Sequence, residues 1–259
     1  MAAREFPMPR GALVTGGAKR IGRAIGLMLG EMGWDVAVHY HASRTEADAV
    51  VAEIKSKGRR AVALEADLMR EDEVASLIGR ASEALGALGC LVNNASLFER
   101  DEALSATRAS WDRHLETNLR APFVLMQGFA RALPADASGA IVNILDERVW
   151  NLTPHFTSYT LAKAGLWTLT RTMALALAPR IRVNGIGPGP TLPSPRQSEE
   201  QFRRQLEAMP LGRGASPEEI AQAVKFILSA PAMTGQMIAL DGGQHLGWTQ
   251  TSREPPASE

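Results

Sequence analysis

The sequence lacks the features that mark several protein classes. Among 259 residues there is one cysteine, Cys90, so an intrachain disulfide is excluded and we expect a reducing compartment, by default the cytoplasm. Residues 1–10 contain two prolines and no apolar run, which predicts neither a signal peptide nor a membrane span. The 28 basic residues balance 28 acidic ones, so neither nucleic acid nor an anionic membrane is expected as a partner.

Histidines are also few, and they do not form a recognisable metal site. Of the five in the chain, His39 and His41 alternate along one expected strand. Because no matching cluster of Cys, His or carboxylates accompanies them, we expect no metal.

The residues that are present fit one α/β domain. Short apolar runs alternate with segments whose apolar residues recur at helical spacing, and this alternation predicts a doubly wound parallel sheet with helices on both faces. The seven expected strands are 12–15, 35–40, 61–65, 90–93, 140–145, 181–184 and 237–240. The expected helices include 45–57, 71–85, 110–133 and 160–178. Residues 1–10 form an extension, 11–248 the single domain, and 249–259 a polar, proline-rich tail that we expect to be disordered.

A glycine-rich turn follows the first expected strand. It reads Thr15-Gly16-Gly17-Ala18-Lys19-Arg20-Ile21-Gly22 and leads into a helix. Backbone amides and the helix dipole favour an anion at such a turn, and a pyrophosphate is the obvious guest. A tight strand-to-helix turn without a ligand is the alternative.

The end of the second strand distinguishes the two nicotinamide cofactors. An acidic residue there would accept a hydrogen bond from the ribose 2′-hydroxyl and repel a 2′-phosphate. This strand instead ends Tyr40-His41-Ala42-Ser43-Arg44, with Lys19 and Arg20 on the neighbouring turn. We therefore predict NADPH, with a solvated loop as the alternative for His41 and Arg44.

Tyr159 and Lys163 are the candidate catalytic pair. They lie four residues apart at the start of an expected helix, so both side chains share one face. A nearby ammonium favours the charged form of a phenol, which makes Tyr159 a plausible general acid. A buried tyrosine with a solvated lysine one turn away is the alternative.

Taken together, these motifs resemble the short-chain dehydrogenase/reductase family, from about residue 11 to 247. The turn resembles Thr-Gly-x3-Gly-x-Gly, the pair matches Tyr-x-x-x-Lys, and Asn93-Asn94-Ala95 resembles the family's Asn-Asn-Ala-Gly stretch. The resemblance implies a Rossmann-type fold, a homotetramer, and a catalytic role for Asn118, which supports the lysine through water.

The resemblance also implies where the cofactor binds. Asp67 matches the adenine contact, and Pro188, Gly189 and Thr191 match the segment that holds the nicotinamide amide. The full set of expected cofactor-binding residues is Gly16, Lys19, Arg20, Ile21, Gly22, His41, Ser43, Arg44, Asp67, Asn93, Ala95, Tyr159, Lys163, Pro188, Gly189 and Thr191.

Two departures from the family pattern point to its pteridine reductase branch. Arg20 replaces the middle glycine of the turn, and Asp146 stands thirteen residues before Tyr159, where a serine is usual. His39-Tyr40-His41, Ser96 and Phe98 also resemble that branch. Ala42 does not, because the branch commonly has an arginine there for the 2′-phosphate; Arg44 is its expected substitute.

Asp146 also indicates the substrate class on chemical grounds. An ionised carboxylate only accepts hydrogen bonds, so it would repel a ketone oxygen and suit a ring rich in N–H donors. If desolvation raised its pKa, it could itself pass a proton. Capping of the following turn is the alternative.

Phe98 lies near the crevice at the switch point, where a flat pterin could stack between its ring and the nicotinamide. Simple loop packing is the alternative for this residue.

We therefore predict NADPH-dependent reduction of pterins or dihydropterins, with dihydrofolate as a further candidate. Tyr159, assisted by Asp146 and Lys163, protonates a ring nitrogen. The expected substrate-binding residues are Arg20, Ser96, Phe98, Asp146 and Tyr159, and the loop 191–207 sets much of the specificity. The alternatives are a carbonyl reductase acting on an acyl, sugar or xenobiotic ketone, and a non-catalytic NADPH-binding regulator.

Overall fold

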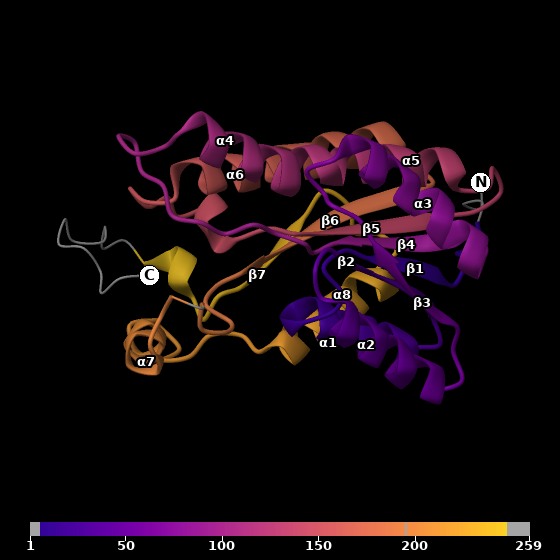
Figure 1. Cartoon of the computed structure of the whole chain (residues 1–259), viewed down its shortest axis with the longest axis horizontal. Helices are drawn as coiled ribbons and strands as arrows, with labels where there is room; N and C mark the ends of the chain where they lie inside the picture. The colour runs from indigo at the N-terminus through magenta and orange to yellow at the C-terminus, as the bar shows by residue number, and fades with distance from the viewer. Residues whose placement is uncertain (1–5, 195, 248–259) are drawn as a thin grey trace.

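The structure, a computed structural model, describes residues 6–194 and 196–247. One parallel sheet in the order β3-β2-β1-β4-β5-β6-β7 forms its centre (Figure 1). The strands are β1 (Gly11–Val14), β2 (Asp35–Tyr40), β3 (Ala61–Glu65), β4 (Leu88–Asn93), β5 (Gly139–Ile144), β6 (Ile181–Pro188) and β7 (Met237–Leu240). The predicted doubly wound, seven-stranded α/β fold is therefore confirmed.

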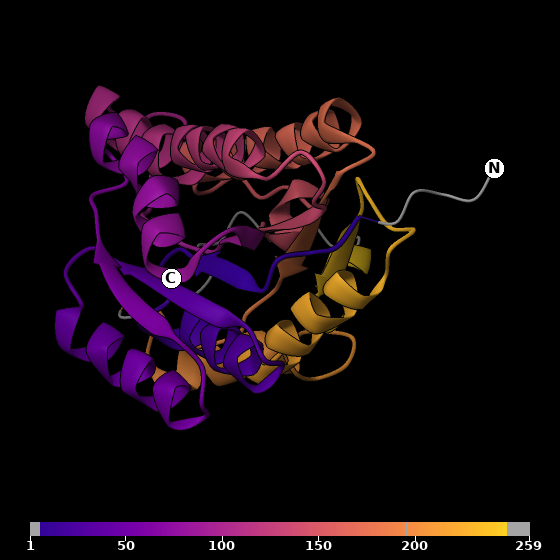
Figure 2. The same ribbon diagram turned by 90° about the vertical axis from the view of Figure 1, so that its right-hand side faces the viewer.

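Helices cover both faces of the sheet (Figure 2). One layer contains α3 (Glu71–Leu85), α4 (Arg108–Leu115), α5 (Ala121–Ala132) and α6 (Thr157–Leu177), and the other contains α1 (Arg20–Glu31), α2 (Arg44–Ser56) and α8 (Pro217–Ser229). Leu13 and Leu91, which pair across β1 and β4, belong to the core of the first layer. Their neighbours Val14 and Val92 belong to the core of the second. Because strand side chains alternate between faces, each apolar run fills two cores.

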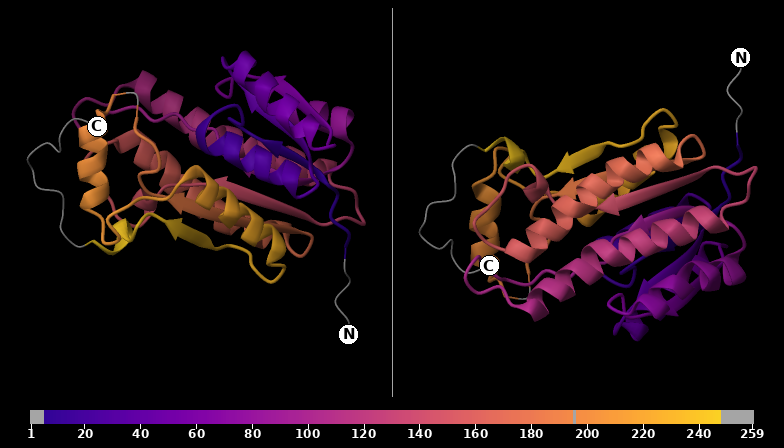
Figure 3. Two further views of the ribbon diagram at one scale, coloured as in Figure 1. Left: turned by 90° about the horizontal axis from the view of Figure 1, so that it is seen from below. Right: turned by 90° about the horizontal axis from the view of Figure 1, so that it is seen from above.

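The order of the strands creates a crevice at one end of the sheet. From β1 the chain proceeds outward through β2 and β3 and then returns to β4, on the other side of β1. Ligands of open α/β sheets bind at such a switch point, beyond the carboxyl ends of the strands. Helix α7 (Glu199–Glu207) lies beyond the same end of the sheet (Figure 3).

Two predictions about this part of the chain were wrong. The single helix expected over 110–133 is divided into α4 and α5 by a π-helical turn, Glu116–Arg120. Pro122, in the first turn of α5, has no N–H to bond to the carbonyl of Asn118, and such a missing bond interrupts an α-helix.

The second error is the expected loop over 191–207, which contains α7. That helix begins with a capping box in which Ser198 and Gln201 exchange hydrogen bonds. The predicted tail, 249–259, lies outside the described residues. Within the described part of the chain, no helix combines the length and apolar character that a membrane crossing requires.

Candidate active site

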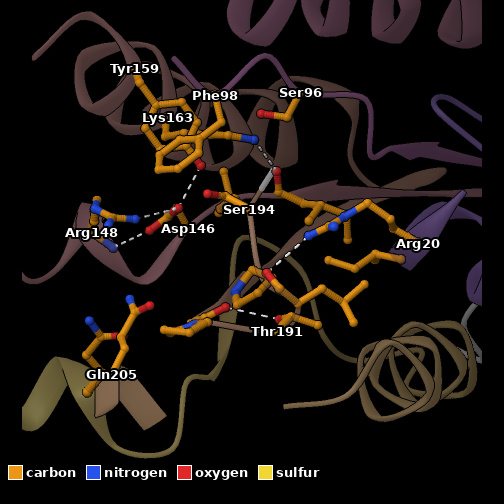
Figure 4. A pocket seen from close by; sticks show the side chains of 18 of the residues that line it. Arg20, Ser96, Phe98, Asp146, Arg148, Tyr159, Lys163, Thr191, Ser194 and Gln205 are labelled. Atoms are coloured by element: carbon orange, nitrogen blue, oxygen red, sulfur yellow. Dashed lines mark hydrogen bonds and ion pairs between the residues drawn. The ribbon is translucent and has the colours of Figure 1, made fainter. Parts of the chain in front are cut away.

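Asp146 and Tyr159 form a buried hydrogen-bonded pair (Figure 4). Asp146 follows β5, and Tyr159 lies in the first turn of α6. The phenol donates to Oδ2 of Asp146 at 2.6 Å, while Oδ1 accepts from the backbone N–H of Arg148 at 2.9 Å. Asp146 therefore caps the following turn and contacts the candidate proton donor at the same time, so the two interpretations of this residue are compatible.

The environment keeps Tyr159 in its neutral form. Burial, followed by the charge and hydrogen bond of Asp146, raises the pKa of Tyr159 well above its ordinary value. Burial and the carboxylate of Asp146 thus hold the phenol protonated. The phenol of Tyr159 therefore carries its proton at neutral pH, as a general acid requires.

Lys163 is the buried cation of the site. Its side chain is 2% exposed, and Nζ donates to the carbonyl oxygen of Ile144 at 2.8 Å. Nζ also lies 5.8 Å from the centroid of the Tyr159 ring. Burial lowers the pKa of Lys163 to about 8, although Asp146 acts in the opposite direction. The ammonium therefore titrates just above neutral pH.

Asn118 holds the loop that follows β4. From the π-helical turn, its Oδ1 accepts from the N–H of Leu97 and its Nδ2 donates to the carbonyl of Leu97, both at 2.8 Å. This two-point contact fixes the backbone beside Ser96 and Phe98. The side chain of Asn118 thus positions this loop, and its support of Lys163 through water stays a prediction.

The glycine turn is held from beneath by buried polar groups. The hydroxyl of Thr15 accepts from the N–H groups of Asn94 and Ala95 at 2.9 and 3.0 Å. His39 Nδ1 accepts from the N–H of Gly16 at 3.0 Å, and its Nε2 then donates to Ala66. Burial lowers the pKa of His39 to about 4, so this imidazole remains a neutral acceptor.

A cavity of about 490 Å³ opens beside this turn. Its lining includes the predicted residues Gly16, Lys19, Arg20, Ile21, Gly22, His41, Asp67 and Ala95. Asn93, Ser43 and Arg44 are not part of it: Asn93 bonds to Asn143 in the core, and Arg44 pairs with Asp48. The glycine turn therefore borders this cavity, whereas the side chain of Arg44 pairs with Asp48, and the predicted contact of Arg44 with a 2′-phosphate stays a prediction.

A second cavity, of about 260 Å³, adjoins Asp146, Tyr159 and Lys163. The predicted residues in its lining are Arg20, Ile21, Ser96, Phe98, Asp146, Tyr159, Lys163, Pro188, Gly189 and Thr191. The ring of Phe98 stacks on Phe156 with centroids 4.4 Å apart and meets the Tyr159 ring edge-on at 4.7 Å. Phe98 and Tyr159 thus share one wall of the cavity.

Comparisons with known proteins agree with this geometry. A family model described as enoyl-(acyl carrier protein) reductase, from the short-chain dehydrogenase/reductase family, matches residues 16–245. This chain is a short-chain dehydrogenase/reductase. The "3-oxoacyl-[acyl-carrier-protein] reductase FabG" of Staphylococcus epidermidis is 36% identical over 244 residues, which is 92% of this chain and all of that protein.

Solved structures give a different set of similar proteins. The "FolM Alternative dihydrofolate reductase 1" of Brucella canis is 46% identical with a TM-score of 0.88, and that of Brucella suis is 48% identical with a TM-score of 0.90. Each pair covers 94% of this chain and 97% of the Brucella chain. Both Brucella structures contain NADP, the cofactor that the sequence predicts for this chain.

Arg20, whose backbone has a φ of +51°, lines both cavities. From this left-handed conformation, which the usual glycine adopts easily, its guanidinium donates to the carbonyls of Leu192 and Pro193 at 3.1 and 3.0 Å. Arg196 donates to the carbonyl of Phe98 at 2.9 Å. Two arginines therefore hold the segment after β6 across the second cavity.

Several residues that line the second cavity were not predicted from the sequence. These are Leu192, Ser194, Gln197, Phe202, Gln205, Gln244 and Arg148. The Arg148 guanidinium lies 5.4 Å from the Phe98 ring centroid, and its Nη1 is 3.5 Å from Oδ2 of Asp146. Its position two residues after Asp146 was the available signal, since a turn at that point returns the side chain toward the carboxylate.

Proposed function

We propose that this short-chain reductase uses NADPH to reduce a pterin or dihydropterin, with dihydrofolate among the candidates. The carboxylate of Asp146, 2.6 Å from the Tyr159 phenol where the family has a serine, is the observation that carries the proposal. A carboxylate accepts hydrogen bonds from N–H groups and repels a carbonyl oxygen, and pterins present several N–H donors. The similarity to the two Brucella alternative dihydrofolate reductases supports the same substrate class.

The glycine turn fits the proposed cofactor. Helix α1 begins at Arg20 without a side-chain cap and without an acidic residue in its first turn, so its amides and dipole are available to an anion. Gly16, Lys19 and Gly22 line the cavity at this point. NADPH bound there supplies a hydride to a ring carbon of the substrate.

Tyr159 is the proton donor in this proposal. Its phenol gives its proton to the ring nitrogen next to the carbon that is reduced. A phenolate beside the carboxylate of Asp146 would be unfavourable in a buried site, and the ammonium of Lys163 offsets that charge. Asp146 orients the phenol beforehand and accepts an N–H of the substrate.

The remaining predicted contacts position the substrate ring. Phe98 provides an apolar face for stacking, and Ser96 and Arg20 supply donors at the border between the two cavities. To contact the substrate or a cofactor phosphate, the guanidinium of Arg20 exchanges its bonds to the carbonyls of Leu192 and Pro193 for bonds to the ligand. Each contact suits a flat, polar heterocycle better than a flexible acyl chain.

A 3-oxoacyl thioester is the competing substrate class, and the 36% identity to FabG favours it. The carboxylate opposes it, because the ketone oxygen of such a substrate would approach Asp146. NADPH consumption by the purified protein should be measured with dihydrobiopterin, dihydrofolate and acetoacetyl-coenzyme A side by side, with NADH as the cofactor control.

Turnover restricted to the pterin substrates and to NADPH is the expected result. Turnover with the thioester alone would replace the substrate class and leave the fold and the role of Tyr159 unaffected. Tight NADPH binding without turnover of any substrate would instead support a regulatory protein.

The proposed assembly is a homotetramer in a reducing compartment such as the cytoplasm. Apolar side chains are exposed on three helices: Trp111 on α4, Leu161 and Leu175 on α6, and Phe226 on α8. Helix faces of this kind are suited to contacts between subunits. Light scattering coupled to size-exclusion chromatography should give four times the mass of the 27.9 kDa chain.

A further inference from the structure

Three buried polar side chains form a network behind Tyr159, outside both cavities. They are Asp101, which is 3% exposed, and Ser158 and His114, which are fully buried. Asp101 lies on the loop that follows Phe98, Ser158 immediately precedes Tyr159 on α6, and His114 lies on α4. Burying a carboxylate is costly unless hydrogen bonds compensate, so this arrangement needs a reason.

The direction of each hydrogen bond in the network is determined. The backbone N–H of Glu99 donates to His114 Nε2 at 3.1 Å, so the proton of the neutral imidazole is on Nδ1. Nδ1 lies 2.7 Å from the Ser158 hydroxyl and donates to it. The hydroxyl in turn donates to Oδ2 of Asp101. The chain of bonds therefore runs from the loop, through α4 and α6, back to the loop.

Asp101 also caps the helix that carries Tyr159. The N-cap residue of α6, Phe156, has a φ of +58° and provides no side-chain cap. Asp101 supplies the missing acceptors from another segment: its Oδ1 accepts from the N–H of Ser158 at 3.1 Å and its backbone carbonyl from that of Thr157 at 3.2 Å. A carboxylate at a helix N-terminus is stabilised by the helix dipole.

A second set of contacts joins the same two segments. Glu102 and His155 form an isolated antiparallel bridge, and His155 Nδ1 lies 3.0 Å from Oε1 of Glu102. Phe98 stacks on Phe156 just before α6 begins. The loop with the stacking ring and the helix with the proton donor are thus joined along their length.

We propose that Asp101 is a positioning residue that, through Ser158 and His114, fixes Phe98 and Tyr159 in one frame. A flat ring stacked on Phe98 has its nitrogen within reach of the Tyr159 phenol only if the two segments keep their relative position. A displacement of about 1 Å at a reacting centre can cost about 100-fold in rate. The inference rests on the proposed function insofar as it assigns a flat heterocycle to this site.

The network requires a neutral His114. Burial lowers the pKa of His114, while the carboxylates of Asp101 and Glu99 act in the opposite direction and Arg113 lowers it further. The other neighbours from α6 are the Ser158 hydroxyl and the Tyr159 ring, whose centroid is 6.0 Å away. A second proton, on Nε2, would face the N–H of Glu99 and break the contact with the loop.

The test compares Asp101→Ala and Asp101→Asn with Asp112→Asn, an exposed α4 carboxylate that pairs with Arg108. For dihydrobiopterin, we expect Asp101→Ala to raise KM about 10-fold and to lower kcat about 10- to 100-fold, with Asp101→Asn in between. The Kd of NADPH should remain within about 2-fold in each, as should all constants of the control. A lower melting temperature with unchanged kcat and KM would reduce Asp101 to a structural residue.

Hydrogen exchange separates this inference from the proposed function, because it needs no substrate. In Asp101→Ala, the amides of residues 97–102 and 157–160 should exchange faster together, while those of α8 remain unchanged. That result, with no pterin turnover by the natural protein, would overturn the proposed function and leave the positioning role intact. Acceleration in only one segment, or in neither, would overturn the positioning role.

Discussion

The glycine turn and the segment 191–207 border the same active site but are held in different ways. The turn rests on short, buried groups: Thr15 accepts from the backbone of Asn94 and Ala95, and His39 accepts from that of Gly16. Such contacts leave few alternative conformations. We expect the cofactor side of the site to keep its shape when a ligand binds.

The segment 191–207 instead depends on long side chains near the surface. Arg20 and Arg196 reach backbone carbonyls across the cavity, and Gln197 bonds to Gln205 at 2.8 Å. Exposed contacts of this kind contribute little each and exchange readily with water. The difference indicates a fixed cofactor site beside an adjustable substrate site, with the catalytic pair between them.

The largest effect should come from Tyr159, the proposed proton donor, which lies between the two regions. Tyr159→Phe removes the proton donor but keeps the ring against Phe98 and Lys163. We expect kcat to fall about 1,000-fold, within the range typical of general acids, while the Kd of NADPH stays within about 2-fold. Steady-state kinetics and fluorescence titration check the two values, and unchanged turnover would remove Tyr159 from the mechanism.

Gly22→Ala should distort the glycine turn and weaken NADPH binding. A Cβ at this position would lie 2.1 Å from the carbonyl oxygen of Gly16, and a rigid turn has no room to yield. We expect the Kd of NADPH to rise about 100-fold, as overpacking of about 3 kcal/mol would produce.

The matched control is Gly79→Ala on α3, where a Cβ would meet nothing within 4 Å. It should leave the Kd unchanged. If Gly22→Ala bound NADPH as tightly as the control, the turn would be as adjustable as the substrate side, and the contrast between the regions would fail.

Asp146→Asn should change the pH dependence of the catalytic pair. Burial lowers the pKa of Lys163 to about 8, and Asp146 raises it toward the ordinary value. Without the carboxylate the pKa falls further, so the ammonium is lost at lower pH. We expect the alkaline limb of the kcat profile to move down by about one pH unit. If the alkaline limb of the kcat profile stayed at the same pH, a group other than Lys163 would be responsible for it.

The smallest effect should come from Arg196→Ala in the adjustable region. The variant loses one exposed hydrogen bond to the carbonyl of Phe98, so KM for dihydrobiopterin should rise about 3-fold while the Kd of NADPH is unchanged. Arg203→Ala, whose side chain pairs with Glu200 and Glu207 on α7, is the control. An increase above 50-fold would mean that this segment is as fixed as the turn.

The same contrast explains what the sequence could predict. The strands and the glycine turn depend on local patterns of apolar residues and glycines, and these were recognised correctly. The π-helical turn at Asn118 was missed because apolar spacing continues through it, although Pro122 marks the missing N–H. Helix α7 was missed because its residues are polar, although Ser198 and Gln201 form a capping box.

Site residues were predictable where the backbone places them and less so where a long side chain chooses its direction. Asp146 and Tyr159 meet because β5 and α6 bring them together. Arg44 pairs with Asp48 although its sequence position suits a 2′-phosphate. Arg148 turns back toward Asp146, and its position two residues after the carboxylate was the one signal of that contact in the sequence.

The most direct test of the account is the ratio of kcat/KM for dihydrobiopterin to that for acetoacetyl-coenzyme A, measured with NADPH in the natural protein and in Asp146→Ser. The account predicts a ratio far above one that falls about 100-fold or more when a serine, which can donate to a ketone oxygen, replaces the carboxylate. A ratio below one in the natural protein, or the same ratio in both, would contradict the assignment of Asp146 as the residue that selects the substrate.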